Sequence, residues 1–270
     1  MLKLIATASL LLMQTLMNTA LAETTPSLSL GSGLWEGISE TNGTNYYALQ
    51  LDDSGEHKLF IANLASAFRY VKQLSFDDND INCTSSECIL SIPYPSEQNT
   101  NLRLIVAPDQ SDSFKVLEMY IDDQNKPILT ATYQLDKKNG KSTVREFVER
   151  YSERIMALDD EFSNELIGVW IGVADIRGGK QLVVLDYKLD GKSEFVLMIN
   201  GSDAVNQTLF NNNNVSFVDD VTQISTTHAT FANQIILHQL TANMLQGHLY
   251  SYHKGQALES ADLKLYRVKK

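Results

Sequence analysis

Gly33-Leu34-Trp35-Glu36-Gly37 decides how the chain folds, because the same pattern returns as Gly168-Val169-Trp170-Ile171-Gly172. The two stretches hold both tryptophans of the 270-residue sequence, and each tryptophan lies within G-x-W-x-G. Self-similarity of this kind indicates an internal duplication, in which each copy builds the same set of elements. We therefore expect two related units, at residues 31–138 and 166–270.

The agreement between the two copies extends past the tryptophans. A strand-like run at 46–51 is followed by a turn at Asp53-Ser54-Gly55, and a similar run at 181–187 is followed by Asp190-Gly191. Asp-Gly and Ser-Gly between strand-like runs are typical of hairpin turns. Each copy then continues as short strand-like runs separated by polar turns.

Short strands joined by tight turns indicate an antiparallel up-and-down meander. Exposed sheet edges invite aggregation, and closure of the sheet into a barrel removes them. The sequence thus predicts an all-β fold of two tandem antiparallel up-and-down β-barrels, with about eight strands each.

One amphipathic helix is predicted between the barrels, within residues 139–165. Thr143 and Glu146 have the spacing of a capping box, which satisfies two backbone N–H groups at the start of a helix. The apolar residues that follow fall on one stripe at a helical period. Because this stripe is too apolar to remain in water, we expect the helix to pack on one or both barrels. The stripe consists of Val144, Phe147, Val148, Tyr151, Ile155, Leu158 and Phe162.

Residues 1–22 have the pattern of a signal peptide. A basic start at Lys3 precedes a mostly apolar run, and Ala20-Leu21-Ala22 is a typical cleavage site. The apolar run is shorter than the ~20 residues that a membrane-spanning helix needs. We expect an exported protein, periplasmic or secreted, with no membrane span.

The formal net charge of −11 makes the chain strongly acidic. A chain without a basic patch cannot displace the counterions of nucleic acid phosphates, so nucleic acid is excluded as a partner. Acidity of this kind favours solubility in an extracytoplasmic compartment.

Cys83 and Cys88 are the two cysteines of the chain. In an exported protein a close, even pair indicates a disulfide bond, since residues flanking a short turn can face each other at bridging distance. The alternative is a redox-active or metal-binding pair. Redox pairs are usually spaced C-x-x-C beside a βαβ pattern, which the sequence lacks, so the disulfide is favoured.

The opening G-x-W strand, the meander behind it and the helix after the last strand resemble the lipocalin group of ligand-binding barrels. The resemblance implies that the tryptophan closes one end of the barrel against a basic residue near the last strand. Trp35 and Trp170 are accordingly candidates for closing the barrels or for lining a ligand cavity, and packing is the usual role of a buried tryptophan. The expected basic partners are Lys137 or Lys138 for Trp35, and Lys264 or Arg267 for Trp170.

Four of the five histidines lie in the second copy, and two of them are candidate metal ligands. If Gln234–Leu240 and Met244–Tyr252 form a hairpin with a three-residue loop, His238 and His248 face each other on one side of it. Two imidazoles so arranged could bind zinc or copper, with His253 or an acid as the third ligand. The alternative is that they are surface or cavity-lining residues without a metal.

The sequence contains no G-x-S-x-G, H-E-x-x-H, Walker or G-x-G-x-x-G motif. We therefore expect neither an enzyme nor a bound cofactor. The leading hypothesis is a non-catalytic protein that binds a small apolar ligand in one or both barrels. The alternative is a structural or protein-interaction module with filled barrels, since an eight-stranded barrel can be filled by side chains or hold one small ligand.

Overall fold

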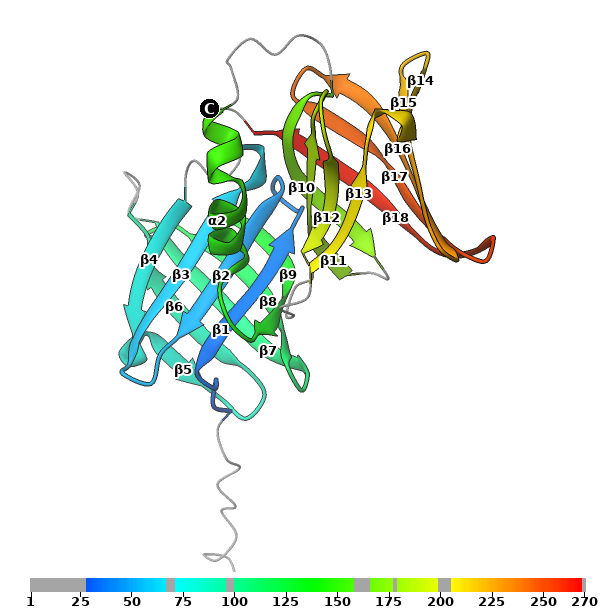
Figure 1. Cartoon of the computed structure of the whole chain (residues 1–270). Coiled ribbons are helices and arrows are strands. Elements are labelled where there is room, and N and C mark those ends of the chain that lie inside the picture. Colours follow the sequence, from blue (N-terminus) through cyan, green and yellow to red (C-terminus); the bar gives the residue numbers. More distant parts are fainter. Residues whose placement is uncertain are drawn as a thin grey trace, which may run out of the picture.

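A computed structural model of the chain describes residues 28–66, 71–95, 100–157, 166–176, 179–198 and 205–268. The expected signal peptide at 1–22 lies outside the described residues. The described part forms two antiparallel sheets of nine strands each, with one α-helix between them (Figure 1). No helix in this part is long and apolar enough to cross a membrane.

The first sheet consists of β1 (Gly33–Ser39), β2 (Asn45–Leu51), β3 (Glu56–Asn63), β4 (Val71–Asp77), β5 (Ile81–Cys83), β6 (Cys88–Pro93), β7 (Asn101–Gln110), β8 (Ser113–Ile121) and β9 (Pro127–Lys138). Its spatial order is β4-β3-β2-β1-β9-β8-β7-β6-β5, so the first strand pairs with the last. The sheet curls into a nearly closed barrel whose edges are β4 and β5 (Figure 1).

The second sheet consists of β10 (Gly168–Ile176), β11 (Gly179–Tyr187), β12 (Ser193–Met198), β13 (Val205–Phe210), β14 (Val215–Val218), β15 (Val221–His228), β16 (Phe231–Thr241), β17 (Met244–His253) and β18 (Gln256–Arg267). Its order is β13-β12-β11-β10-β18-β17-β16-β15-β14, and it forms a half-barrel (Figure 1). The two orders are the same, so the predicted duplication is observed strand for strand. Each sheet has nine strands, in agreement with the prediction of about eight, and ends in a short edge strand, β5 or β14.

The structure gives a separate reason for each glycine of G-x-W-x-G. Gly33 and Gly168 have φ angles of 142° and 124°, a region that residues with a Cβ rarely adopt. At Gly37 a Cβ would lie 1.8 Å from the carbonyl oxygen of Gln134, and at Gly172 it would lie 1.8 Å from that of Lys264. The second glycine therefore lets the first strand cross close to the last strand, where each sheet curls back on itself.

Inward-facing side chains fill the first barrel. They alternate with outward-facing residues along each strand, as the pleat of a strand requires. Large apolar residues from eight strands meet in this core, so its middle is packed with side chains. Leu49, Leu59, Leu90, Leu104 and Leu135 are among the members with no exposed surface.

The helix α2 spans Thr143–Met156, and its N-cap lies one residue before the one that the sequence predicts. Ser142 is the cap, and its hydroxyl accepts a hydrogen bond from the Arg145 N–H at 3.2 Å. The predicted cap, Thr143, is instead the first helical residue and is buried against the first sheet. Val148, placed on the apolar stripe by its spacing, is half exposed. Leu158 and Phe162, the last two members of the predicted stripe, lie outside the described residues.

A second apolar cluster joins the two sheets and the helix into one body. Outward-facing residues of β1 to β3 meet outward-facing residues of β10 to β12, and the buried face of α2 closes the cluster. The helix therefore packs on both sheets, as expected, and lies across their junction (Figure 1). The cluster includes Ile38, Tyr46, Ala48, Phe147, Tyr151, Val169, Ile171 and Val184.

Polar contacts flank this junction. The Thr44 hydroxyl and the Tyr266 hydroxyl lie 2.9 Å apart, and Lys180 pairs with Glu40 at 2.7 Å. On the second sheet the helix is held by Arg150, which pairs with Glu194 at 3.0 Å. These contacts fix the register of two surfaces that the apolar cluster alone would allow to slide.

Candidate functional site

A cavity of about 660 Å³ lies between the start of α2 and the outer face of the first sheet. We name it the helix groove. Its volume falls within the ~300–1,000 Å³ typical of small-molecule sites. The apolar lining residues are Leu34, Ala48, Phe60, Val71 and Val144, joined by the ring of Tyr46 and by the charged residues Asp52, Lys141 and Arg145.

The apolar walls of the helix groove arise from strand alternation. Ala48 pairs with Phe60 on the neighbouring strand, so both side chains point to the outer face of the sheet. Outer positions of a barrel in water are normally polar. Here they are apolar because α2 and the second sheet cover much of this face, and the helix groove is the part left open.

Glu36 anchors the floor of the helix groove to the start of the helix. Its carboxylate accepts hydrogen bonds from the Tyr46 hydroxyl, the Thr143 hydroxyl and, at 2.8 Å, the Thr143 N–H. Burial raises the pKa of Glu36, while the hydrogen bonds from Thr143 and Tyr46 oppose that rise. A carboxylate at a first-turn N–H satisfies a backbone donor that has no partner within the helix.

Lys138 completes this anchor from the end of β9. Its ammonium donates to Glu146 Oε2 at 3.0 Å and to the Thr143 hydroxyl at 3.4 Å. The helix start is thus tied to both the first and the last strand of the first sheet. This fixes the position of Val144, which forms one wall of the helix groove.

The two basic residues at the helix groove share one carboxylate as their partner. Lys141 and Arg145 both pair with Glu149, at 2.8 Å and 3.1 Å. Exposed pairs of this kind are screened by solvent, so they shape the rim more than they stabilise the fold. The helix groove therefore favours an apolar ligand and does not require a charged one.

The basic partners expected for the two tryptophans are resolved by the strand register. Lys137 pairs with Trp35, and its ammonium lies 5.5 Å from the ring centroid. Arg267 pairs with Trp170, and its guanidinium lies 4.3 Å from the ring centroid. Both distances are within the range of cation–π contacts. Lys264 lies instead over the ring of Tyr266.

Trp170 lines a second cavity, of about 510 Å³, at one end of the half-barrel. We name it the Trp170 pocket. The ring N–H of Trp170 donates to the Leu166 carbonyl at 2.8 Å, whereas the ring N–H of Trp35 has no partner among the described residues. Trp170 and Trp35 are both almost wholly buried, which suits the closure of a barrel end. Other residues of the Trp170 pocket are Phe217, Asp219, Asp220, Thr222, Gln239 and Leu245.

A buried carboxyl group lies inside the first barrel, on β8. Glu118 is 2% exposed and accepts hydrogen bonds from the Tyr133 hydroxyl at 3.0 Å and the Tyr47 hydroxyl at 3.4 Å. The rings of these tyrosines stack with centroids 4.0 Å apart. Burial raises the pKa of Glu118, and the hydrogen bonds from Tyr133, Tyr47 and Tyr120 lower it in part. We name these four residues the glutamate–tyrosine cluster.

The duplication shows what the fold itself requires at this cluster. Register equates Glu118, Tyr47 and Tyr133 with Leu249, Val183 and Leu263 of the second sheet. Those three residues are apolar and fully packed, so the same barrel positions need no carboxyl group. The glutamate–tyrosine cluster is therefore a feature of the first copy alone.

The two candidate metal ligands are not opposite each other. His238 pairs with Gln246, and His248 pairs with Ile236 and Asp262. The loop at Ala242–Asn243 has two residues, not three, and a register shift between Gln239 and Thr241 adds to the change, so the two histidines are no longer opposite. His248 bonds to Asp262 at 2.8 Å, and the described residues contain no group of three or more histidine, cysteine, aspartate or glutamate side chains able to hold a metal.

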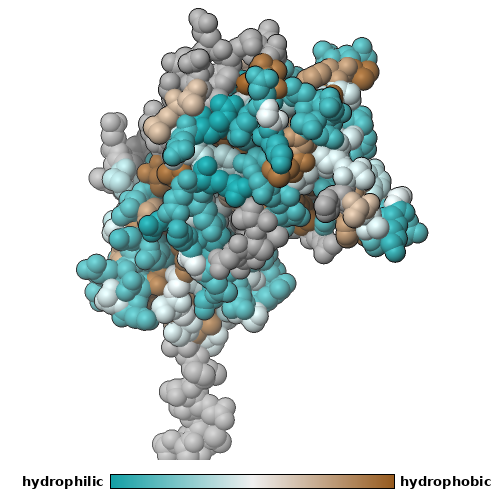
Figure 2. Space-filling view, in the orientation of Figure 1, coloured by the Kyte–Doolittle hydropathy of each residue, from teal (hydrophilic) through white to brown (hydrophobic). Residues whose placement is uncertain are grey.

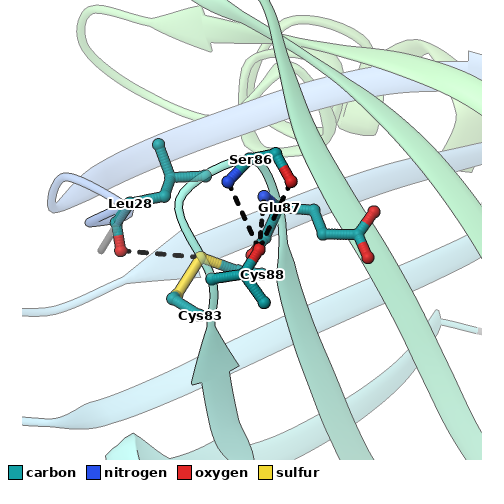
Figure 3. The surroundings of a disulfide bond; sticks show 6 residues. Leu28, Cys83, Ser86, Glu87 and Cys88 are labelled. Atoms are coloured by element: carbon teal, nitrogen blue, oxygen red, sulfur yellow. Dashed lines mark hydrogen bonds between the residues drawn. A yellow bond between two sulfur atoms is a disulfide. The ribbon is translucent and has the colours of Figure 1, made fainter. Parts of the chain in front are cut away.

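Cys83 and Cys88 form the expected disulfide bond across the β5–β6 hairpin. Their Cα atoms are 4.0 Å apart, and the loop between them is ordered by the Thr84 hydroxyl, which accepts from the backbone N–H groups of Ser86 and Glu87 (Figure 3). The carbonyl oxygen of Leu28 lies 3.9 Å from Cys88 Sγ. A paired cysteine is neither a nucleophile nor a metal ligand, so this hairpin is structural.

Sequence reasoning missed both the helix groove and the glutamate–tyrosine cluster. The only local signal for the cluster was Glu118 at an inward position of its strand, between the inward residues Val116 and Tyr120. The helix groove had no local signal, because its walls come from strands and a helix that are distant in the sequence.

No family model matches the chain, and no curated protein gives a significant match. Among solved structures, the chain is similar to a protein with unknown function from the DUF3598 family of Nostoc punctiforme PCC 73102. That match covers 88% of this chain and 96% of the other, with 11% sequence identity and a TM-score of 0.27. A likeness at this level supports no statement on function, and the lipocalin resemblance remains a prediction.

Proposed function

We propose that this is a non-catalytic, exported protein that binds a small apolar ligand in the helix groove. The observation that carries the proposal is the cavity of about 660 Å³ with predominantly apolar walls. Ligand sites combine such walls with a few polar groups that orient the ligand. Here Gln50 and the rim residue Asp52 provide those polar groups.

The proposal moves the ligand from the inside of a barrel to the outside. The first barrel is packed with large, almost wholly buried side chains, as the structural alternative supposes. Its outer face remains apolar and is only partly covered. A ligand in the helix groove would complete the cover over Phe60 and Val71, and Val71 is 39% exposed without it.

Two matched variants test the proposal. Val144 and Val148 are one helical turn apart on α2, but only Val144 lines the helix groove. Val144→Trp should fill the cavity and abolish the co-purification of apolar small molecules, measured by native mass spectrometry of the exported protein. Val148→Trp should leave that signal unchanged.

The result that would contradict the proposal is equally specific. If the native protein carries no bound molecule, and fluorescent apolar probes bind equally to both tryptophan variants, the helix groove is not a ligand site. The structural alternative, with filled barrels and working outer surfaces, would then be the better account.

A further inference from the structure

The Trp170 pocket has a counterpart in the first sheet, and there the chain covers it. The hairpins β5–β6 and β14–β15 each follow a short 3-10 helix with the same capping arrangement. Counted from these helices, the pair Cys83 and Cys88 stands where Phe217 and Thr222 stand in the second sheet. The two hairpins are therefore equivalent positions of the duplication.

In the first copy a short segment of the chain, Leu28–Leu30, lies against this hairpin. The Leu28 N–H donates to the Thr84 carbonyl at 2.6 Å, and the Leu28 carbonyl lies beside Cys88 (Figure 3). The side chains of Leu28 and Leu30 pack against the core that contains Trp35. Two apolar side chains, two residues apart, thus complete this end of the first barrel.

In the second copy Leu166, which is 6% exposed, packs on the core beside Trp170 and lines the pocket, but the positions that correspond to Leu28 and Leu30 are polar in sequence. Counted back from Trp170, the positions of Leu28–Leu30 are Ser163–Glu165, which lie outside the described residues and have the polar sequence Ser-Asn-Glu. The hairpin there leaves Phe217 63% exposed and Val218 64% exposed. These residues belong to β14, which projects at the upper right of Figure 2, where hydrophobic surface lies beside hydrophilic surface.

The edges of the Trp170 pocket suit a peptide. β14 is an edge strand of the second sheet, so one side of its backbone makes no sheet hydrogen bonds within the described residues. Such an edge can accept an added segment of chain. Asp219 and Asp220 lie at the turn and line the pocket, which adds negative charge to a chain that is already acidic.

We propose that the Trp170 pocket is a docking site for a short segment of another polypeptide, with two apolar side chains at i and i+2 and a basic residue beside them. The apolar pair would take the place that Leu28 and Leu30 take in the first copy. The basic residue would pair with Asp219 or Asp220. This site is separate from the helix groove and does not depend on it.

The probe is a synthetic peptide with the sequence Pro26–Ser32 of this chain followed by two lysines. Isothermal titration calorimetry with the full-length exported protein should show saturable binding. Changing both leucines of the peptide to aspartate should weaken binding at least tenfold. Removing the two lysines should weaken it, and raising the salt concentration should do the same, because exposed charge pairs are screened by salt.

Variants of the protein locate the binding. Thr222→Trp should fill the pocket and weaken binding at least tenfold. Phe217→Asp should do the same, and because Phe217 is largely exposed this variant should keep its melting temperature. Ser225→Trp, on the same strand but on the other face, is the matched control and should bind like the native protein.

Three results would overturn the proposal. The first is a native protein that does not bind the peptide at millimolar concentration. The second is binding that Thr222→Trp and Phe217→Asp leave unchanged. The third is binding that appears only after Phe162→Ala, because the linker of the chain itself would then be the occupant of the Trp170 pocket.

Discussion

Burying the carboxyl group of Glu118 inside a barrel costs free energy. A carboxylate loses its hydration when it is buried, and hydrogen bonds from Tyr47 and Tyr133 replace that hydration only in part. The second copy shows that leucine serves at the same position, since Leu249 is packed in its core. The cost is therefore not imposed by the fold.

The charge state of Glu118 should make stability depend on pH. Burial raises its pKa in the folded protein above the ordinary value of 4.5, so the folded state binds this proton more tightly than the unfolded chain. The stability that the protonated Glu118 side chain contributes is fully present below about pH 4.5. It is lost as pH rises through the raised pKa of Glu118. Urea unfolding across pH should show the native protein losing stability relative to Glu118→Gln over that interval.

The control is Glu149→Gln. Hydrogen bonds from Lys141 and Arg145 lower the pKa of Glu149, so its effect has the opposite sign: the native protein should gain stability relative to this variant as pH rises toward 4.5. If the Glu118→Gln difference is independent of pH, Glu118 has an ordinary pKa and the cluster has no electrostatic consequence.

Single residues could be predicted where their partners are close in the sequence or fixed by the repeat. The pairing of Cys83 with Cys88 required only a hairpin. The contacts of Trp35 and Trp170 with basic residues were implied by the resemblance to lipocalins, and the structure shows one such contact for each tryptophan. The prediction that His238 and His248 face each other was wrong for a related reason. A change of one residue in a loop changes the register of the hairpin, and the sequence does not fix loop length to that precision.

At the scale of elements, α2 illustrates how tertiary contacts change a local prediction. Thr143 and Glu146 have capping-box spacing, yet Thr143 bonds to Glu36, a residue far away in the chain. Ser142 then takes the role of the cap. The prediction of a buried stripe was right for Phe147 and Tyr151 and wrong for Val148. A 3.6-residue period shows that one side of the helix is apolar, but it does not show which residues lie at the middle of the buried side.

The buried face of α2 should contribute most of what the helix adds to the stability of the protein. Phe147 is 2% exposed within the cluster between the sheets, and Val148 is 50% exposed. Phe147→Ala should lower the free energy of unfolding by about 3–5 kcal/mol through lost burial and a residual cavity. Val148→Ala should change it by about 0.5 kcal/mol or less. Urea unfolding of both variants gives the comparison, and equal small effects would mean that the helix does not pack as described.

At the scale of the molecule, the duplication was visible in the sequence but the junction was not. G-x-W-x-G specifies each sheet separately. The junction depends on outward residues such as Ile38 and Ile171, which could equally have been read as inward residues of a strand with no exposed face. Nothing in a single strand reveals which of its faces will meet a second sheet.

The junction should make the two halves interdependent. A chain that ends at Ala157 keeps the first sheet and α2 but exposes Ile38, Tyr46 and Ala48, which the second sheet covers in the full protein. We expect this fragment to unfold at lower urea concentration and to self-associate, as measured by analytical ultracentrifugation. A monomeric fragment with an unchanged midpoint would show that the junction adds no stability.

The pairing of first strand with last has a consequence for the order of events as the chain emerges from the ribosome. A chain made from its amino end delivers β1 long before β9, and neither sheet can pair its first strand with its last until that last strand arrives. Contacts between such distant segments form slowly, and unpaired strands are prone to aggregate while they wait. Closure at Gly37 and Gly172 is thus a late step, and the junction between the sheets can assemble only after both closures are made.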